Sequence, residues 1–264
     1  YGFDKNLLGL AKIQKGVYLN GSGLKLAKAY AAEDEVIEPT WSSIEFVDGN
    51  DGKGGGFGIL RAGKGKDQTV LAMKYGVHGL GHGHFDKLHF MYYDQGSDVV
   101  PDYGFSRWIN IETKYGGRYL PENDTYAKQT IAHNTLVVDG MTQNGNDRDA
   151  AEKIHGERHF FDASNPDIQV MSATADGYYA GIDMQRTMFL IRDDRLEYPV
   201  VVDVYRVATD KQHQYDMPLH FHGQIMNSNF KYETQSTLQK PLGKAYGYEH
   251  IWKTAEAKVM SDAS

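Results

Sequence analysis

The spacing of apolar residues changes near residues 38–40, which divides the chain into two parts of different character. Before that point, apolar residues recur at helical spacing in two short segments, Leu7, Leu8, Leu10 and Ala11, then Leu24, Leu26, Ala27 and Tyr30. The turn-forming stretch LNGSG, residues 19–23, separates them. The pattern predicts two short helices at the start of the chain.

From Trp41 onward the chain consists of short segments rich in Val, Ile, Phe and Tyr, separated by Gly, Asn and Asp. Examples are GFGILRAG, QTVLAMKYG, LHFMYYDQG, IQVMSATADG, RTMFLIRDD and YPVVVDVYRV. Strands at regular spacing with turn signals between them favour an antiparallel sandwich or barrel. We therefore expect a mainly β protein, with a helical segment over residues 1–40 and an antiparallel β-sandwich domain over residues 41–264.

Composition excludes several classes of protein. The net charge is -7 and no basic tail or Lys/Arg run occurs, which argues against a nucleic-acid binder. The chain has no cysteine, so a metal site would have to use His, Asp, Glu or water. No apolar run approaches the length of a membrane span, and no signal peptide opens the chain. The first residues, YGFDKNLLGLAK, have the character of mid-domain sequence, so we expect a fragment of a longer protein.

Two motifs look functional but have simpler explanations. The stretch from Gly58 to Lys64 fits the first part of a phosphate-binding loop, yet Gly65 replaces the required Ser or Thr and a strand-like segment follows. A hairpin turn explains these glycines better. The pair His220 and His222 lacks a carboxylate in register and is expected to be a half-buried strand pair, with a ligand role left open.

The segment GLGHGHFDKLHF, residues 79–90, is the most informative part of the chain. It places His82, His84 and Asp86 at alternate positions, and side chains two apart on a strand share a face. Two imidazoles and a carboxylate on one face suit a metal site or a site for an acidic sugar. The alternative is a polar, His-rich entry to a strand with no chemistry.

Three residues on separate strand-like segments could bind one ion. His84, Asp102 and His133 offer two imidazoles and a carboxylate, which are ligands that zinc accepts in the absence of cysteine. Their separation in the sequence is more typical of a fold-stabilising site than of a compact catalytic motif. Judged on spacing alone, three unrelated polar residues would remain the better interpretation.

These segments also carry a resemblance. HGHFDKLHF, DYGFSR, GGRYLPEN and KQTIAHNTLVVDG closely resemble the heparinase II/III-like polysaccharide lyases, above all the oligoalginate lyases of polysaccharide lyase family 17. That resemblance implies a helical toroid followed by an antiparallel β-domain, with the active site in the cleft between them. It also implies one chiefly structural zinc on His84, Asp102 and His133. Tyr119 and His82 would be catalytic, and Arg107 and His82 would bind substrate.

The resemblance further implies the activity. Such an enzyme cleaves alginate oligosaccharides by β-elimination and releases unsaturated uronate, by exolytic action, and it is periplasmic or secreted in bacteria. Its partners are the anionic uronate oligosaccharide and the toroid domain, which supplies the remaining catalytic residues, so this chain holds part of an active site. The alternatives are a heparin or heparan-type lyase of the same superfamily and a non-catalytic, zinc-stabilised domain that binds carbohydrate or packs on its partner domain.

Overall fold

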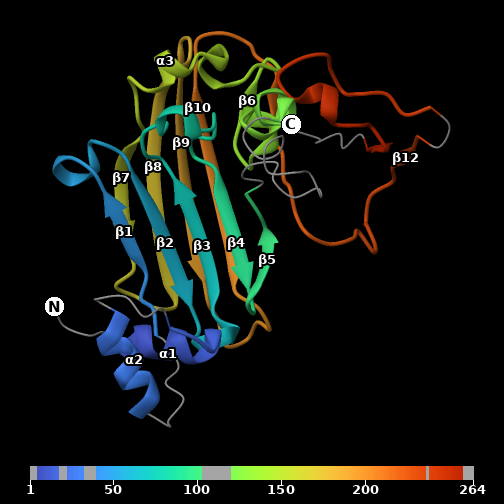
Figure 1. Ribbon diagram of the computed structural model, residues 1–264. Coiled ribbons are helices and arrows are strands. Elements are labelled where there is room, and N and C mark those ends of the chain that lie inside the picture. Colours follow the sequence, from blue (N-terminus) through green and yellow to red (C-terminus); the bar gives the residue numbers. More distant parts are fainter. Residues whose placement is uncertain (1–4, 18–22, 33–39, 103–119, 236–237, 258–264) are drawn as a thin grey trace.

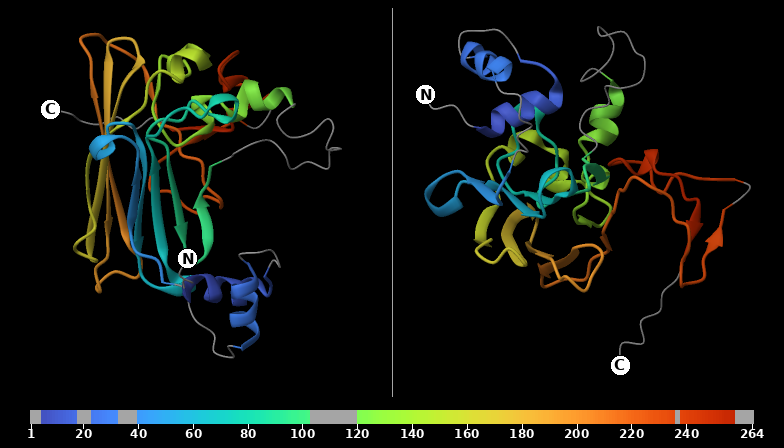
Figure 2. Two further views of the ribbon diagram at one scale, coloured as in Figure 1. Left: turned by 60° about the vertical axis from the view of Figure 1, so that its left-hand side comes forward. Right: turned by 90° about the horizontal axis from the view of Figure 1, so that it is seen from below.

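Two antiparallel β-sheets packed face to face form most of the computed structural model, which describes residues 5–17, 23–32, 40–102, 120–235 and 238–257 (Figure 1). The first sheet has the strand order β1-β2-β3-β4-β5 and the second has the order β10-β9-β8-β7. Seen from the side, the two sheets form separate layers (Figure 2). The expectation of a mainly β, antiparallel architecture is confirmed.

The strands follow the predicted apolar segments closely. The first sheet contains β1 (Ile44–Val47), β2 (Gly56–Ala62), β3 (Thr69–Lys74), β4 (Phe90–Asp94) and β5 (Ser97–Val100). The second contains β7 (Glu157–Asp162), β8 (Ile168–Tyr179), β9 (Ile182–Ile191) and β10 (Val200–Ala208). Two small two-stranded sheets pair β6 (Val137–Val138) with β11 (Tyr215–Asp216), and β12 (Glu233–Thr234) with β13 (Ala255–Glu256).

Two short helices precede the sheets, as the apolar spacing predicts. They are α1 (Lys5–Gln14) and α2 (Gly23–Ala32), and they lie at the end of the sandwich opposite to α3 (Arg148–Ala151) (Figure 1). The side chain of Asn6 ties α1 to the segment before β1, because it exchanges hydrogen bonds with the backbone N–H and C=O of Thr40. In the described part of the chain, no helix is both long enough and apolar enough to cross a bilayer.

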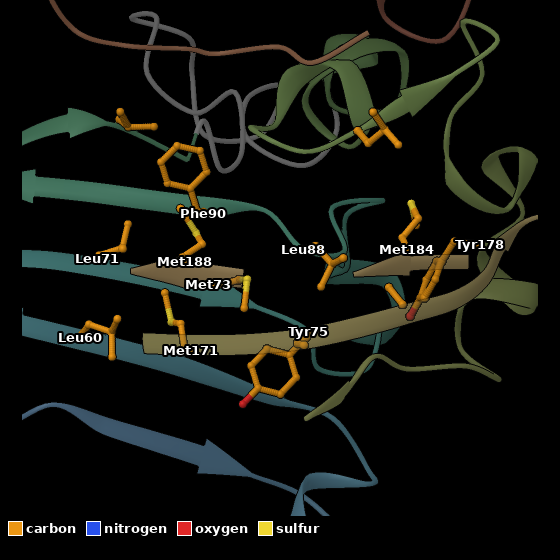
Figure 3. Close-up of a cluster of buried hydrophobic side chains, with 14 of the residues drawn as sticks. Leu60, Leu71, Met73, Tyr75, Leu88, Phe90, Met171, Tyr178, Met184 and Met188 are labelled. Atoms are coloured by element: carbon orange, nitrogen blue, oxygen red, sulfur yellow. The ribbon is translucent and has the colours of Figure 1, made fainter. Parts of the chain in front are cut away.

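Alternation along the strands produces the core. In β2 the buried positions are every second residue, and β9 buries Ile182, Met184, Arg186, Met188 and Leu190 in the same way. Side chains of both sheets meet between the layers, among them Leu60, Leu71, Met171 and Met188 (Figure 3). Burial of each large apolar side chain contributes about 1.5–3 kcal/mol, so this interface supplies most of the favourable free energy of folding.

The glycines of the suspected phosphate-binding loop lie in a hairpin. β2 pairs antiparallel with β3 up to Ala62 and Thr69, and a single 3-10 turn, η2 (Gly65–Asp67), lies in the connection. Gly63 has a φ of 81°, in the left-handed region that favours glycine. A phosphate-binding loop would instead open a helix. The turn interpretation is therefore confirmed.

One core position of β9 is occupied by a cation. Arg186 is 1% exposed and lies between the apolar residues Met184 and Met188 on the inward face. Its Nε and Nη2 donate to the two carboxylate oxygens of Asp203 on β10, at 2.9 and 2.6 Å. A buried charge is tolerated only when it is paired and hydrogen-bonded, and this bidentate pair meets both requirements.

The same guanidinium reaches the loops above the core. Its Nη1 donates to the carbonyl oxygens of Leu88 and Asn134, at 2.7 and 2.6 Å. The guanidinium carbon lies 4.5 Å from the ring centroid of Phe90 and 5.3 Å from that of Tyr205. Arg186 therefore joins the second sheet to two loop segments that are far apart in the sequence.

We predict that Arg186→Met lowers the free energy of unfolding by about 1–3 kcal/mol, because it leaves the carbonyl groups of Leu88 and Asn134 without their buried donor. Urea denaturation followed by tryptophan fluorescence measures this change. Arg206→Met is the matched control, since Arg206 is exposed on the neighbouring strand, and its effect should stay within about 0.5 kcal/mol. Equal effects of the two substitutions would contradict the role of Arg186.

Candidate metal centre

The His-rich segment is a folded loop, and the expectation that it is a strand is wrong. A 3-10 turn, η3 (Leu80–His82), opens it, and β4 begins only at Phe90. Positive φ values at Leu80 (58°) and Leu88 (62°) interrupt any extended conformation. His82, His84 and Asp86 therefore do not share one strand face, because His82 is exposed whereas His84 and Asp86 are buried.

Gly83 explains this separation. A Cβ atom at residue 83 would lie 2.2 Å from the carbonyl oxygen of His78, which is far too close for any side chain. The loop therefore packs tightly against His78 at this point and turns inward. As a result, the residue before Gly83 faces solvent and the residue after it enters the interior.

Asp102 reaches the same region through a hairpin. β4 and β5 are antiparallel, and Tyr92 pairs with Val100. Continuing this register by two residues brings Asp102 beside Phe90, where β4 starts and the His-rich loop ends. The hairpin therefore places a carboxylate next to His89.

His133 lies in a wholly buried stretch, residues 130–138, which begins with the turn η6 (Thr130–Ala132). The next residue, Asn134, locks this stretch to the first sheet. Its side-chain amide donates to the carbonyl oxygens of Pro101 (3.1 Å) and Phe90 (3.4 Å). The stretch containing His133 is thus attached to the ends of β4 and β5.

The three predicted ligands converge. Nδ1 of His133 lies 3.4 Å from Oδ1 of Asp102, and the rings of His84 and His133 are 5.2 Å apart between centroids. A third imidazole joins them, because the ring of His89 is also 5.2 Å from that of His133 and its Nε2 is 3.9 Å from Oδ2 of Asp102. The segments are loops and strand ends, and not the successive strands that the sequence suggested.

Two overlapping groups of donors in the described residues are compact enough to hold a metal ion. They are His84, Asp86 and His133, and His89, Asp102 and His133, each with one ligand atom per residue within 4.8 Å of the others. His133 belongs to both groups, and the predicted partners His84 and Asp102 are divided between them. His82 belongs to neither. Arg107 and Tyr119 lie outside the described residues.

The surroundings of His133 fit an ion. Both of its ring nitrogens are buried and have no hydrogen-bond partner among the described residues, an unfavourable arrangement that a bound ion would relieve. Donor atoms about 2.0–2.2 Å from a tetrahedral ion lie roughly 3.3–3.6 Å apart. The 3.4 Å between Nδ1 of His133 and Oδ1 of Asp102 falls in that range.

The imidazoles of His84 and His89 are in the protonation state that a metal requires. Burial, with a further contribution from His133, lowers the pKa of His84 to about 4. Burial and His133 together lower the pKa of His89 to about 3. Both rings are therefore neutral at neutral pH, and a neutral imidazole can offer a lone pair to a metal.

Asp86 already has a different task. Its Oδ2 lies 2.7 Å from Nζ of Lys74, and its Oδ1 lies 3.5 Å from Nζ of the buried Lys87. Burial by itself would raise the pKa of Asp86, but the two lysines outweigh burial and hold the pKa well below its usual range. Because Lys87 has no other carboxylate partner in the described residues, Asp86 serves as the counterion of the lysines.

His89 is excluded as a ligand by a hydrogen bond. The backbone N–H of Asn134 donates to its Nδ1 over 2.8 Å, so Nδ1 carries no proton. In a neutral ring the proton must then be on Nε2, the nitrogen that faces Asp102. A protonated nitrogen cannot bind a metal. With Asp86 and His89 set aside, His84, Asp102 and His133 remain as donors, and His133 lies close to each of the other two.

The second His pair is not part of the centre. His220 and His222 lie outside any strand, so the expectation of a strand pair is wrong. His220 instead supports the buried stretch. Its backbone N–H donates to Oδ1 of Asn134 (2.6 Å), and its ring Nε2 lies 2.8 Å from the carbonyl oxygen of Ile131. Neither histidine belongs to the two donor groups of the described residues.

An open hollow borders the exposed side of the loop. Its volume is ≈ 770 Å³, and its lining includes His78, Gly83, Lys128 and Arg148. Both cations are paired with neighbouring carboxylates, Lys128 with Asp124 at 2.7 Å and Arg148 with Asp149 at 3.1 Å. The lining also contains Asp147, so carboxylates outnumber cations and the hollow is polar and slightly acidic.

Sequence reasoning missed three residues of this region, namely His89, Asn134 and Arg186. His89 and Asn134 stand in the motifs DKLH and HNT, but the hydrogen bond that joins them connects segments 45 residues apart. Arg186 could have been noticed because it occupies an inward-facing position in the alternating pattern of β9, between Met184 and Met188.

The family model and the similar proteins place this chain in the same family. The family model described as "Heparinase II/III-like, C-terminal" matches residues 47–260. The chain is 44% identical to an exo-oligoalginate lyase of Saccharophagus degradans, over 99% of this chain and 35% of that relative. It is 42% identical to an alginate lyase of Stenotrophomonas maltophilia, over 98% of this chain and 34% of that relative. The chain therefore spans about one third of the length of the curated relatives it matches.

Among solved structures, a heparinase III gene product with methylated lysines superposes with a TM-score of 0.57. The superposition covers 98% of this chain and 38% of that structure, at 18% sequence identity. At this identity the likeness concerns the fold alone.

Proposed function

This chain belongs to the heparinase II/III-like C-terminal family, and we propose that it is the β-domain of a polysaccharide lyase that cleaves alginate oligosaccharides by β-elimination. The observation that carries this proposal is the 44% identity to an exo-oligoalginate lyase over 99% of the chain. The heparin-type alternative has weaker support, because the likeness to a heparinase III structure is 18% in sequence. By the same resemblance, the enzyme acts exolytically in the periplasm or outside a bacterial cell.

The reaction sets clear demands on the site. Elimination across C4 and C5 of a uronate removes the proton beside a carboxylate, and that proton is poorly acidic while the carboxylate is charged. Neutralising the carboxylate with Arg, His or amide donors stabilises the enolate-like transition state. We assign Arg107 and His82 to this neutralisation. The exposure of His82 at the tip of its loop is compatible with contact to a substrate.

A tyrosine can then transfer the proton. A nearby cation lowers the pKa of a phenol from its ordinary value of about 10, so that the hydroxyl can act as base and then as acid. We assign this role to Tyr119, in the company of His82 and Arg107. Acid–base catalysis of this kind is worth about 100-fold or more in rate.

We propose that His84, Asp102 and His133 hold one zinc ion. The 3.4 Å between Nδ1 of His133 and Oδ1 of Asp102 and the 5.2 Å between the rings of His84 and His133 support this proposal. When bound, the ion would supply a cross-link between three loop segments and would not take part in proton transfer. Its role is chiefly structural, because the two histidine donors are buried whereas His82 faces solvent.

The chain would then supply half of an active site. We propose that residues 1–40 belong to the end of a helical toroid and residues 41–264 to the β-domain, with the remaining catalytic residues and one wall of the cleft on the toroid. The relatives that the chain matches are about three times as long, which supports this arrangement. The partner of the assembled cleft is an anionic uronate oligosaccharide.

We predict that the protein purified without chelator contains one zinc per chain and that chelation lowers its melting temperature. An ion present at 100 times its Kd stabilises the folded state by about 2.7 kcal/mol. Elemental analysis and thermal melting measure the two effects. His84→Ala should lose both the metal and the stability, whereas His82→Ala, two residues earlier in the same loop, should retain both. Metal retained at full occupancy in His84→Ala would contradict the ligand assignment.

We predict that the isolated chain degrades alginate at least about 100-fold more slowly than the complete enzyme, because proximity and orientation require both walls of the cleft. Ultraviolet absorbance of the unsaturated product gives both rates. Comparable turnover by the chain alone would mean that the β-domain contains a whole active site.

In the complete enzyme, we predict that Tyr119→Phe lowers kcat by about 100-fold or more while KM changes little, since the ring remains and only the proton-transferring hydroxyl is lost. Steady-state kinetics on alginate oligosaccharides separate the two constants. His82→Ala should also lower turnover, with its zinc content unchanged. A near-normal kcat in Tyr119→Phe would assign the proton transfer to a tyrosine of the toroid.

A further inference from the structure

We propose that His89 is a positioning residue of the metal centre: its Nε2–H faces Oδ2 of Asp102 and, when the ion is bound, donates to that oxygen and holds the carboxylate in place. The proposal rests on the zinc site of the proposed function and adds a residue that is not a ligand. It follows from the proton position on His89, from the geometry around Asp102 and from the way His89 itself is fixed.

The proton position is determined by the backbone. An amide N–H can only donate, so the 2.8 Å contact from the N–H of Asn134 requires a lone pair on Nδ1 of His89. The neutral ring therefore presents Nε2–H on its opposite side. Nε2 is buried and has no hydrogen-bond partner among the described residues, so this donor needs an acceptor.

Among the described residues, Asp102 provides the carboxylate acceptor that faces His89. Its Oδ2 lies 3.9 Å from Nε2 of His89, while its Oδ1 lies 3.4 Å from Nδ1 of His133. The carboxylate therefore presents one oxygen to each histidine. A shift of about 1 Å would bring Nε2 and Oδ2 to hydrogen-bond distance and leave Oδ1 available to the ion.

His89 is rigid enough to orient its neighbour. It is fully buried, and its ring meets that of His133 edge to face. Arg186 donates a hydrogen bond to the carbonyl oxygen of the preceding residue, Leu88. The backbone N–H of Asn134 donates to Nδ1 of the His89 ring. Asp102, in contrast, has a side chain that is 29% exposed and follows the end of β5. The rigid donor therefore orients the more accessible carboxylate.

Two substitutions separate the two sides of the ring. In His89→Asn the side-chain oxygen can take the place of Nδ1 and accept the N–H of Asn134, but the donor toward Asp102 is lost. In His89→Gln the side-chain amide can take the place of Nε2 and donate to Asp102, while the acceptor for Asn134 is lost. Removal of a group that supports a metal ligand typically weakens metal affinity by about 10–100-fold.

The test is zinc affinity of the complete enzyme, measured by competition with a chromophoric chelator, with apo-protein melting as the readout of plain structural support. We expect His89→Asn to bind zinc at least about tenfold more weakly than His89→Gln, although His89→Gln has the lower apo melting temperature. Equal affinity of the two variants, or tighter binding by His89→Asn, would overturn the proposal. A wild-type protein without zinc would instead overturn the proposed metal site itself.

If either variant fails to fold, the tautomer of the unaltered protein decides. Selective ¹⁵N labelling of histidine reports which ring nitrogen carries the proton. We expect protonated Nε2 and unprotonated Nδ1 at His89. The reverse tautomer, or a zinc-bound Nε2, would overturn the positioning role.

Discussion

A single buried guanidinium, that of Arg186, determines how the second sheet meets the loops that carry the candidate metal centre. A charge in this position is compatible with folding only if each of its buried donors finds an acceptor. Asp203 provides the countercharge, and the carbonyl groups of Leu88 and Asn134 complete the arrangement. Because a displaced loop would leave the cation unsatisfied, the sandwich and the two loop segments take up their relative positions together.

This constraint explains a strained residue beside the site. Leu88 has a φ of 62°, a conformation that costs a non-glycine residue about 1–3 kcal/mol and persists only where its surroundings enforce it. Its side chain is fully buried, its N–H donates to the carbonyl oxygen of Lys74, and its own carbonyl accepts from Arg186. The strain therefore serves to turn His89 toward Asn134 and Asp102, and the packing of the core stabilises that geometry.

The sequence predicted the sheets well because alternation and turn residues are local properties. The predicted apolar segments coincide with β2, β3, β4, β8, β9 and β10, and Gly63 marks the β2–β3 hairpin, whereas β5 and β7 had no predicted segment. The convergence of His84, Asp102 and His133 was accessible only through resemblance, because their proximity depends on how loops pack. The strand assignment of the His-rich segment failed for the same reason, since the contact of Gly83 with His78 has no counterpart in a periodicity. Arg186 and Asn134 escaped notice because their partners are distant in the sequence.

The turn at Gly83 also shows how one loop can serve two purposes. His82 and His84 are separated by one residue, yet the first is exposed and the second lies beside His133. A strand could not divide them in this way, because residues two apart would share a face. The close approach to His78 allows only glycine at residue 83, so the inward turn is imposed by packing. In the function proposed above, the imidazole that contacts substrate lies two residues from a metal ligand, so the position of His82 would depend on the stability of the metal centre.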